Sequence, residues 1–282
     1  MQTSELINFG SKTLRKSTNS HRIDAEIILS HILKISREKI LISENEVSKK
    51  NISKFKYLIN RRLCNEPIAY ILNKKEFRSK DFFVDKKSLI PRPETELIID
   101  PIVKEFKNKS LFFLDIGVGS GCIISSILKE LSHSKGVGID ICKDTILNAK
   151  INLINLKVQN RARLLNRSFK NIFNHKFDLV VSNPPYVVRR DINRLSNDIK
   201  KFEPKLALDG GNDGLDVIRK IIYKSKSILK LNGILALEIG RGQYFSVVKI
   251  LKENGFRKSR VIKDYKNNVR CIFSTLLKNK TK

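Results

Sequence analysis

The sequence predicts an α/β protein in which a parallel sheet with crossover helices follows a small helical domain. After residue 110, short apolar runs alternate with helical stretches, which is typical of parallel strands joined by helices. Before residue 70, by contrast, the apolar residues recur at helical spacing. With 282 residues, the chain is long enough to fold as one medium-sized domain and one small domain.

Residues 1–72 are predicted to form the helical domain. Asn19-Ser20 is suited to cap a helix that carries the first of two apolar stripes. The second stripe runs from Ile52 to Leu63, and Glu66-Pro67 then ends the pattern because proline cannot continue a helix. This segment contains no glycine-rich loop and no cluster of catalytic residue types, so we interpret it as a substrate-docking domain. The first stripe consists of Ile23, Ile27, Ile28, Ile32 and Leu33.

Residues 73–90 are predicted to form a connecting hairpin, because Glu76-Phe77 and Phe82-Phe83-Val84 have the composition of short strands. The remaining residues, 91–282, are predicted to form the α/β domain. A helix is expected to begin near Thr95, after a stretch that two prolines stiffen.

Four apolar runs are the predicted strands of the sheet. Their continuous apolar character is expected of parallel strands that are buried on both faces. Cys122–Leu128, shortly after the first run, is predicted to be a helix. The four runs are residues 111–116, 136–140, 177–182 and 233–239.

The charge of the chain is strongly positive, with 56 Lys and Arg against 28 Asp and Glu and a formal net charge of +28. Such a field favours acidic partners, above all nucleic acid. A general bias toward Lys, Asn and Ile along the whole chain is the competing explanation. The sequence leaves both open, so it allows a basic binding surface but does not require a nucleic-acid partner.

No metal site, disulfide or membrane span is expected. The cysteines form no C-x-x-C pair, and no His lies at metal-ligand spacing from them. No apolar run approaches the length of about 18 residues that a membrane helix needs. The first ten residues include Glu5 and lack a long apolar core, so we expect no signal peptide and a cytoplasmic protein. The cysteines are Cys64, Cys122, Cys142 and Cys271.

A glycine-rich loop, Asp115-Ile116-Gly117-Val118-Gly119-Ser120-Gly121, ends the first apolar run. Its glycines permit a tight turn and close approach by a ligand, toward which the following helix would point its N-terminus. Asp140 ends the next run, where a carboxylate can accept hydrogen bonds from both hydroxyls of a ribose. The D-x-G-x-G-x-G string resembles the cofactor loop of S-adenosylmethionine-dependent methyltransferases, in which the carboxylate before the glycines helps to orient the loop and the amino-acid portion of the cofactor. We therefore predict a site for S-adenosyl-L-methionine, with a purely structural turn or a nicotinamide site as the alternatives.

A second motif, Asn183-Pro184-Pro185-Tyr186, ends the third apolar run and is expected at the same edge of the sheet. The side-chain carbonyl of Asn183 and the backbone carbonyl of Pro184 can accept the two N–H groups of a planar NH2, and Tyr186 offers an aromatic face. Holding both protons aligns the nitrogen lone pair with a methyl donor. We predict that Asn183, Pro184 and Tyr186 are catalytic, that the whole motif binds substrate, and that Asn183 also lies beside the cofactor. An ordinary turn is the alternative.

The motif does not by itself identify the nitrogen, because adenine, cytosine and glutamine all present a planar NH2 group. A nucleic-acid amino methyltransferase is the main alternative, favoured by the positive charge, although the chain has no insertion large enough for a domain that reads a flipped base. A ribosome- or RNA-binding protein with a degenerate cofactor site is a third reading. The intact loop, Asp140 and Asn183 argue against lost activity.

Further motifs resemble those of the bacterial release factor glutamine methyltransferase family, over the chain from about residue 60 to 272. Pro67-x-Ala69-Tyr70-Ile71, Glu76-Phe77 and Leu89-Ile90-Pro91-Arg92-Pro93-Glu94-Thr95-Glu96 precede the glycine loop. Phe202-Glu203-Pro204, Ala207-Leu208-x-Gly210-Gly211, Glu238-x-Gly240-x-x-Gln243, Asp264-Tyr265 and Arg270 follow Asn183-Pro184-Pro185-Tyr186.

This resemblance implies a Rossmann-like, seven-stranded methyltransferase domain preceded by the helical domain. It implies methyl transfer to the glutamine of the Gly-Gly-Gln motif in class-1 peptide chain release factors, supporting translation termination, with the helical domain helping to hold the factor. It also implies that Ser168 belongs to the cofactor site. The chain departs from the family at Val118, where threonine is common, and at Arg167-Ser168-Phe169, where an acidic residue followed by a bulky apolar one is usual beside the adenine.

Overall fold

The protein divides into two compact units in a computed structural model that describes residues 1–171 and 176–277. The first unit comprises Met1–Lys74 together with Ser196–Phe202. The second comprises Lys75–Leu195 and Glu203–Lys282. The predicted hairpin segment therefore belongs to the larger unit from Lys75 onward.

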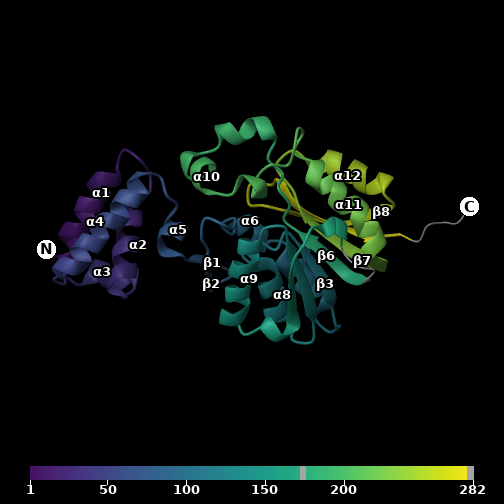
Figure 1. Cartoon of the computed structure of the whole chain (residues 1–282), viewed down its shortest axis with the longest axis horizontal. Helices are drawn as coiled ribbons and strands as arrows, with labels where there is room; N and C mark the ends of the chain where they lie inside the picture. The colour runs from purple at the N-terminus through teal and green to yellow at the C-terminus, as the bar shows by residue number, and fades with distance from the viewer. Residues whose placement is uncertain (172–175, 278–282) are drawn as a thin grey trace, which may run out of the picture. The chain divides into compact units, whose positions relative to one another are not determined.

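The smaller unit is helical (Figure 1). Its apolar core joins α1, α2 and α4, and α1 approaches α4 so closely that a Cβ at Gly10 would lie 2.8 Å from the ring of Phe55. Both predicted apolar stripes are helices, but Ile23 of the first stripe is 46% exposed, because it faces away from that core. The helices are α1 (Thr3–Leu14), α2 (His21–Leu33), α3 (Arg37–Ile42), α4 (Lys49–Leu63), α5 (Ile68–Leu72) and α10 (Asn197–Phe202).

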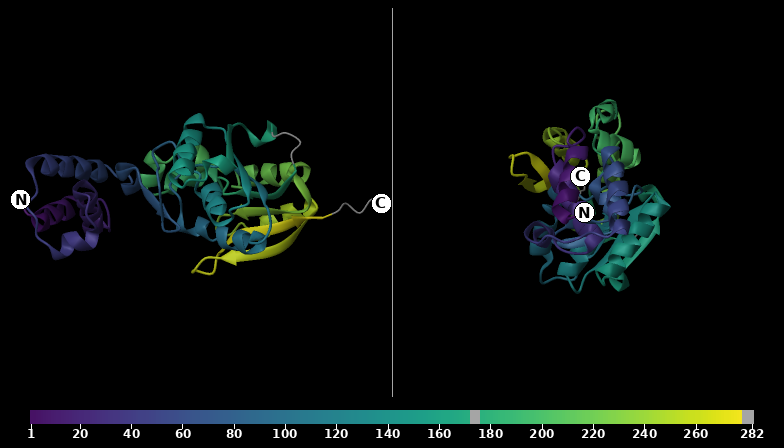
Figure 2. Two further views of the ribbon diagram at one scale, coloured as in Figure 1. Left: turned by 90° about the horizontal axis from the view of Figure 1, so that it is seen from below. Right: turned by 90° about the vertical axis from the view of Figure 1, so that its left-hand side faces the viewer.

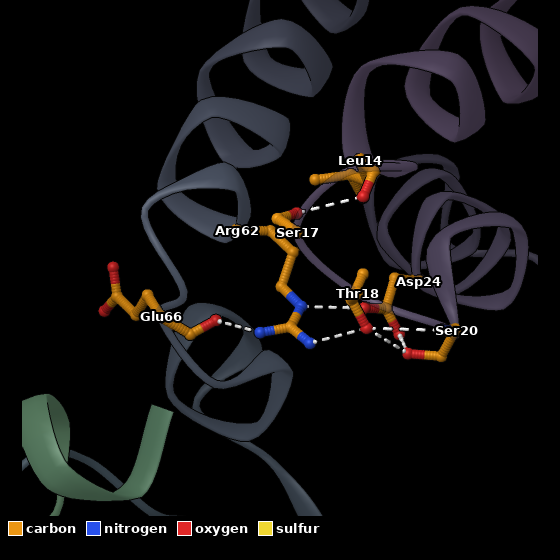
Figure 3. A network of polar contacts seen from close by, with 7 residues as sticks. All are labelled: Leu14, Ser17, Thr18, Ser20, Asp24, Arg62 and Glu66. Carbon is orange, nitrogen blue, oxygen red and sulfur yellow. Dashed lines mark hydrogen bonds and ion pairs between the residues drawn. The ribbon is translucent and has the colours of Figure 1, made fainter. Parts of the chain in front are cut away.

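A buried ion pair fixes the end of α4 within this unit (Figure 3). Nε of Arg62 lies 2.7 Å from the carboxylate of Asp24 in α2, which also accepts a hydrogen bond from Ser20. The same guanidinium donates to the hydroxyl of Thr18 and to the backbone carbonyl of Glu66. Because Asp24 is only 5% exposed, loss of either partner would leave a buried charge unpaired, which is strongly destabilising.

The larger unit begins with the predicted hairpin, formed by β1 (Lys75–Phe77) and β2 (Lys80–Phe82). The backbone N–H of Arg78 donates to the carboxylate of Glu96, and the Arg78 guanidinium lies 2.7 Å from Asp100. These contacts attach the hairpin to α6 (Pro93–Glu96) and α7 (Ile99–Phe106). The single helix predicted to start near Thr95 is thus two short helices.

A seven-stranded sheet forms the centre of the larger unit, in the order β5-β4-β3-β6-β7-β9-β8. The first five strands in this order are parallel, and β9 is antiparallel to both of its neighbours. This is the predicted Rossmann-like arrangement, with the yellow β8–β9 hairpin at one edge (Figure 2). The strands are β3 (Phe112–Ile116), β4 (Lys135–Asp140), β5 (Ala162–Asn166), β6 (Phe177–Ser182), β7 (Leu229–Glu238), β8 (Phe256–Lys263) and β9 (Val269–Leu276).

Helices cover both faces of the sheet. On one face, α7, α8 (Cys122–Glu130) and α9 (Lys143–Asn155) pack against Phe113 and Val181. Figure 1 shows α8 and α9 beside the sheet. On the other, α11 (Asp216–Ile228) and α12 (Tyr244–Glu253) pack against Val180 and Leu235. Alternate residues of each central strand therefore enter different cores, which explains the continuous apolar runs. Short 3-10 helices are η1 (Gln159–Arg161), η2 (Phe169–Asn171), η3 (Arg189–Arg194) and η4 (Lys205–Ala207).

Two further features concern only the described residues. No helix among them is long and apolar enough to cross a membrane. No group of three or more His, Cys, Asp or Glu side chains among them is arranged to hold a metal ion.

Candidate functional site

A cavity of about 290 Å³ lies at the carboxyl ends of β3, β4 and β6, and all its lining residues belong to the larger unit. The structure brings together here the glycine loop after β3, Asp140 at the end of β4 and the Asn183 motif after β6. The 91–96 stretch also contributes, through Pro91, Arg92 and Thr95. Parallel strands present their carboxyl ends at one edge, which explains why segments so far apart in the sequence meet.

The loop after β3 depends on glycine for two different reasons. Gly117 and Gly119 have φ angles of 73° and 55°, in the left-handed region that favours glycine, and both line the cavity beside Val118 and Ser120. Gly121, at the start of α8, is not among the described lining residues. A Cβ there would lie 3.1 Å from that of Ala149, so this glycine allows α8 to pack closely against α9.

Asp115 supports the glycine loop through a hydrogen bond to the start of the helix that follows it. Its side chain is completely buried, and Oδ2 accepts a hydrogen bond of 3.1 Å from the backbone N–H of Ile124 in the first turn of α8. Burial, together with the negative charge of Asp140, raises the pKa of this carboxyl to about 7. Asp115 is not among the described residues that line the cavity, so its contact in the structure is with the loop–helix junction.

Asp140 faces the cavity directly. Its Oδ2 accepts a hydrogen bond of 3.2 Å from the N–H of Gly119, and its Oδ1 accepts one of 3.0 Å from the N–H of Cys142. Burial raises the pKa of this carboxyl, while these backbone hydrogen bonds oppose the rise. The loop and the carboxylate therefore hold each other in place, and each oxygen retains a lone pair for a ligand.

The segment after β5 contributes Arg167 and Phe169 to the lining, whereas Ser168 between them is not among the described lining residues. Phe169 also packs against the apolar core beneath α11. The ring of Phe169 thus adds apolar surface to this part of the lining.

Asn183, Pro184 and Pro185 line the cavity, and Ser182 anchors them by donating from its hydroxyl to the carbonyl of Ile116 over 2.7 Å. The side-chain Nδ2 of Asn183 donates to the hydroxyl oxygen of Thr95 over 3.0 Å. Because this bond engages the amide nitrogen, the carbonyl oxygen is the end of the Asn183 side chain that remains for a ligand.

Tyr186 lies behind the other three residues of the motif and is not among the described lining residues. Its hydroxyl lies 3.4 Å from the buried carboxylate of Glu238, and the guanidinium of Arg270 lies 5.9 Å from the centre of its ring. Burial and the charge of Glu238 raise the pKa of the phenol to about 12. The phenol is therefore a neutral hydrogen-bonding group at ordinary pH.

Glycines and a glutamine enclose the backbone of Tyr186. A Cβ at Gly210 would lie 2.8 Å from the Cα of Tyr186, and one at Gly214 would lie 2.5 Å from its carbonyl oxygen. The side chain of Gln243 donates to the carbonyls of Tyr186 and Gly214 and accepts from the N–H of Gly240. Gly210, Gly240 and Gln243 were recognised from the sequence only as parts of family motifs, and Gly214 was not singled out, because their contacts are non-local.

An ion pair closes one side of the cavity. Nη2 of Arg92 lies 2.6 Å from Oε1 of Glu203, whose side chain is 1% exposed. The pair joins the stretch before α6 to the segment that leads into η4, and Arg92 and Pro204 both line the cavity. Two further motifs of the family resemblance are therefore in direct contact.

Family models match both parts of the chain. The PrmC N-terminal domain matches residues 5–72, and the Methyltransferase small domain matches residues 93–201. A release factor glutamine methyltransferase of Caulobacter vibrioides is 36% identical over 253 residues, which cover 89% of this chain and 88% of the relative. The chain belongs to the release factor glutamine methyltransferase family. The resemblance read from the sequence is thereby confirmed.

Other relatives of the release factor glutamine methyltransferase family also match most of this chain. The release factor glutamine methyltransferase of Buchnera aphidicola is 38% identical, over 89% of this chain and 91% of its own. A bifunctional methyltransferase of Rickettsia prowazekii is 34% identical over 95% of this chain, which spans only 56% of that longer protein.

Solved methyltransferase structures share the fold of this family member. A methyltransferase from Pyrococcus furiosus has a TM-score of 0.55 at 17% identity, covering 78% of this chain and 98% of that one. A ribosomal protein L11 methylase from Lactobacillus delbrueckii has a TM-score of 0.52 at 17% identity, covering 69% and 84%. Both confirm the predicted fold class.

Proposed function

We propose that this protein transfers a methyl group from S-adenosylmethionine to the side-chain amide nitrogen of the glutamine in the Gly-Gly-Gln motif of class-1 peptide chain release factors. The observation that carries the proposal is the orientation of Asn183, whose amide nitrogen is bound to Thr95 and whose carbonyl is left for a ligand. Family membership supplies the substrate class. Translation termination is a cytoplasmic process, so we place the protein there.

The cavity residues fit S-adenosylmethionine. The positive-φ glycines at 117 and 119 let a ligand approach the backbone closely, and the carboxylate of Asp140 retains lone pairs for the two hydroxyls of a ribose. Phe169 and Ile141 offer apolar surface for an adenine ring. When bound, S-adenosylmethionine would supply an electrophilic methyl group.

The residues of the chain would act mainly by positioning. The Asn183 carbonyl would accept one N–H of the glutamine amide, and the Pro184 carbonyl would accept the other. An amide nitrogen is a weak nucleophile because its lone pair is delocalised, and two acceptors favour the positive charge that develops as its new bond to carbon forms. The surplus proton of the nitrogen leaves to solvent afterwards, so the site needs no strong base before transfer.

The wall behind these acceptors is rigid, which suits a positioning role. The two prolines restrict the backbone of the motif, and Gln243 with its glycine neighbours fixes the carbonyl of Tyr186. The phenol of Tyr186 is held between Glu238 and Arg270. A rigid pair of acceptors loses little entropy when the substrate amide enters.

A nucleic-acid amino methyltransferase is the second candidate, and the net charge of +28 is the observation that favours it. One assay separates the two. The purified chain is incubated with methyl-labelled S-adenosylmethionine and, in separate reactions, a class-1 release factor, tRNA and duplex DNA. We expect label on the release factor, and label on nucleic acid alone would contradict the proposal.

A further inference from the structure

A chain of polar groups runs from Asn183 through the buried Thr95, which also lines the cavity, to the buried Glu238. Asn183 Nδ2 donates to Thr95 Oγ1 over 3.0 Å, and the Thr95 hydroxyl interacts in turn with the carboxylate of Glu238. Thr95 is 2% exposed and Glu238 is completely buried. Glu238 belongs to the end of β7, so this chain links the substrate motif to the centre of the sheet.

Burial raises the pKa of Glu238 to about 7, although the hydroxyl of Thr95 and the charge of Arg270 favour its ionised form. Nη2 of Arg270 lies 3.8 Å from Oε1, which also receives the hydroxyl of Tyr186. The other carboxyl oxygen of Glu238, Oε2, has no hydrogen-bond partner among the described residues. A buried carboxylate oxygen left without a donor is costly, so the Thr95 proton is drawn toward it.

This arrangement sets the direction of every hydrogen bond in the chain. When Glu238 is ionised, its carboxylate can only accept, so the single proton of the Thr95 hydroxyl goes to Glu238. The hydroxyl oxygen then presents only lone pairs to Asn183, and only the NH2 end of that carboxamide can pair with it. The carboxamide is thereby held with its oxygen toward the cavity, although its two ends are nearly the same size.

We propose that Thr95 is a positioning residue for methyl transfer, which acts by fixing the Asn183 carboxamide with its carbonyl toward the target NH2, and that Glu238 sets the direction of the Thr95 hydroxyl. With the carboxamide flipped, two NH2 groups would face each other and the target would lose an acceptor. The inference rests on the proposed function for its substrate. Thr95 itself does not contact the reacting atoms.

Thr95→Val tests this inference, because valine keeps the shape of threonine and removes only the hydroxyl. We expect kcat for methylation of a release factor to fall about tenfold or more, the scale of one buried hydrogen bond that orients a catalytic group. The KM for S-adenosylmethionine is expected to stay unchanged. Thr95→Ser restores the hydroxyl and should recover most of kcat. Thr275→Val in β9 makes the same chemical change outside the cavity lining and should match wild type.

Two kinetic results would overturn the proposal: a kcat of Thr95→Val equal to that of wild type, or a Thr95→Ser variant as impaired as Thr95→Val. A second measurement uses the unaltered chain and does not depend on turnover. The side-chain NH2 protons of Asn183 should exchange with solvent more slowly than those of the exposed Asn267, as measured by NMR. Equally fast exchange would also overturn it. If wild type fails to methylate release factors, the proposed function fails, and the exchange measurement still decides the Thr95 contact.

Discussion

At the scale of single residues, the proposed reaction would depend on the carbonyl oxygen of Asn183. Asn183→Ala removes an acceptor that the target nitrogen would need most in the transition state. We expect kcat to fall by about a hundredfold to a thousandfold, the usual effect of losing one preorganised hydrogen-bonding group. Cofactor affinity should remain near that of wild type, as measured by calorimetry. Unchanged turnover would remove Asn183 from the role given to it here.

The corresponding prediction for cofactor affinity concerns Asp140. Its carboxylate faces the cavity and already fixes Gly119, so Asp140→Ala loses both the ribose acceptors and the support of the loop. We expect the dissociation constant for S-adenosylmethionine to rise about tenfold to a hundredfold, since hydrogen bonds to charged groups are the stronger kind. Asp100→Ala, which alters a carboxylate that is 75% exposed on α7, is the matched control. An unaltered affinity of Asp140→Ala would mean that the ribose lies elsewhere.

How far the sequence predicts individual site residues depends on how local their contacts are. The glycine loop, Asp140 and Asn183 are recognisable because each lies at a strand end and has a residue type suited to its chemistry. Thr95 was expected as the start of a helix and as part of a family motif, but its contact with Asn183 spans 88 positions of sequence and could not be predicted. Glu238 and Arg270 were recognised as parts of family motifs but were given no role. Sequence spacing does not predict which residue of another strand a side chain will contact.

At the scale of elements, the carboxyl end of β3 holds a buried carboxyl group, Asp115, whose charged form is unfavourable there. Burial raises the pKa of Asp115 from 3.8 to about 7. The folded state therefore holds this proton more tightly than the unfolded state. The contribution to the free energy of unfolding is complete below the unfolded pKa and is lost as pH rises through about 7.

Asp115→Asn removes this dependence because asparagine stays neutral. We expect the free energy of unfolding of this variant, relative to wild type, to be higher at about pH 8 than at about pH 5. Urea unfolding of both proteins at the two pH values measures the difference, with Asp100→Asn as the control. The same relative stability at both pH values would show that Asp115 does not carry the raised pKa.

The central strands were predictable from sequence, and the outer strands were not. β3, β4, β6 and β7 are covered by helices on at least part of both faces and therefore read as apolar runs. β8 lies at the edge of the sheet, and five of its eight residues are exposed, so a stretch such as Arg257–Arg260 has no strand-like alternation. β5 is the opposite edge and is interrupted by Arg163. Edge strands lack the two-sided burial that marks a strand in sequence.

At the scale of the whole molecule, the net charge of +28 is the property that the fold does not explain. Charge that steers a partner acts over a distance of about 10 Å at 0.1 M salt and weakens as salt rises. We expect kcat/KM for the release factor to fall about tenfold from low to physiological salt, with kcat at saturating factor little changed. A salt titration of initial rates measures both. A flat kcat/KM would assign the charge to compositional bias.

The cavity and the predicted docking role belong to different units of the chain. Every described residue that lines the cavity belongs to the larger unit, so the smaller unit is available for the docking role that the sequence predicted. The apolar core and the Arg62–Asp24 pair of the smaller unit give it a defined structure of its own. The proposed function thus requires one reaction centre in the larger unit and one class of protein substrate.

Mapping the position of the transferred methyl group tests this account most directly. A class-1 release factor is incubated with the chain and S-adenosylmethionine, digested, and sequenced by tandem mass spectrometry. We expect one added methyl group on the side chain of the glutamine in Gly-Gly-Gln, formed much more slowly when Asn183→Ala replaces wild type. A methyl group on any other residue, or an unmodified factor alongside methylated tRNA or DNA, would contradict it.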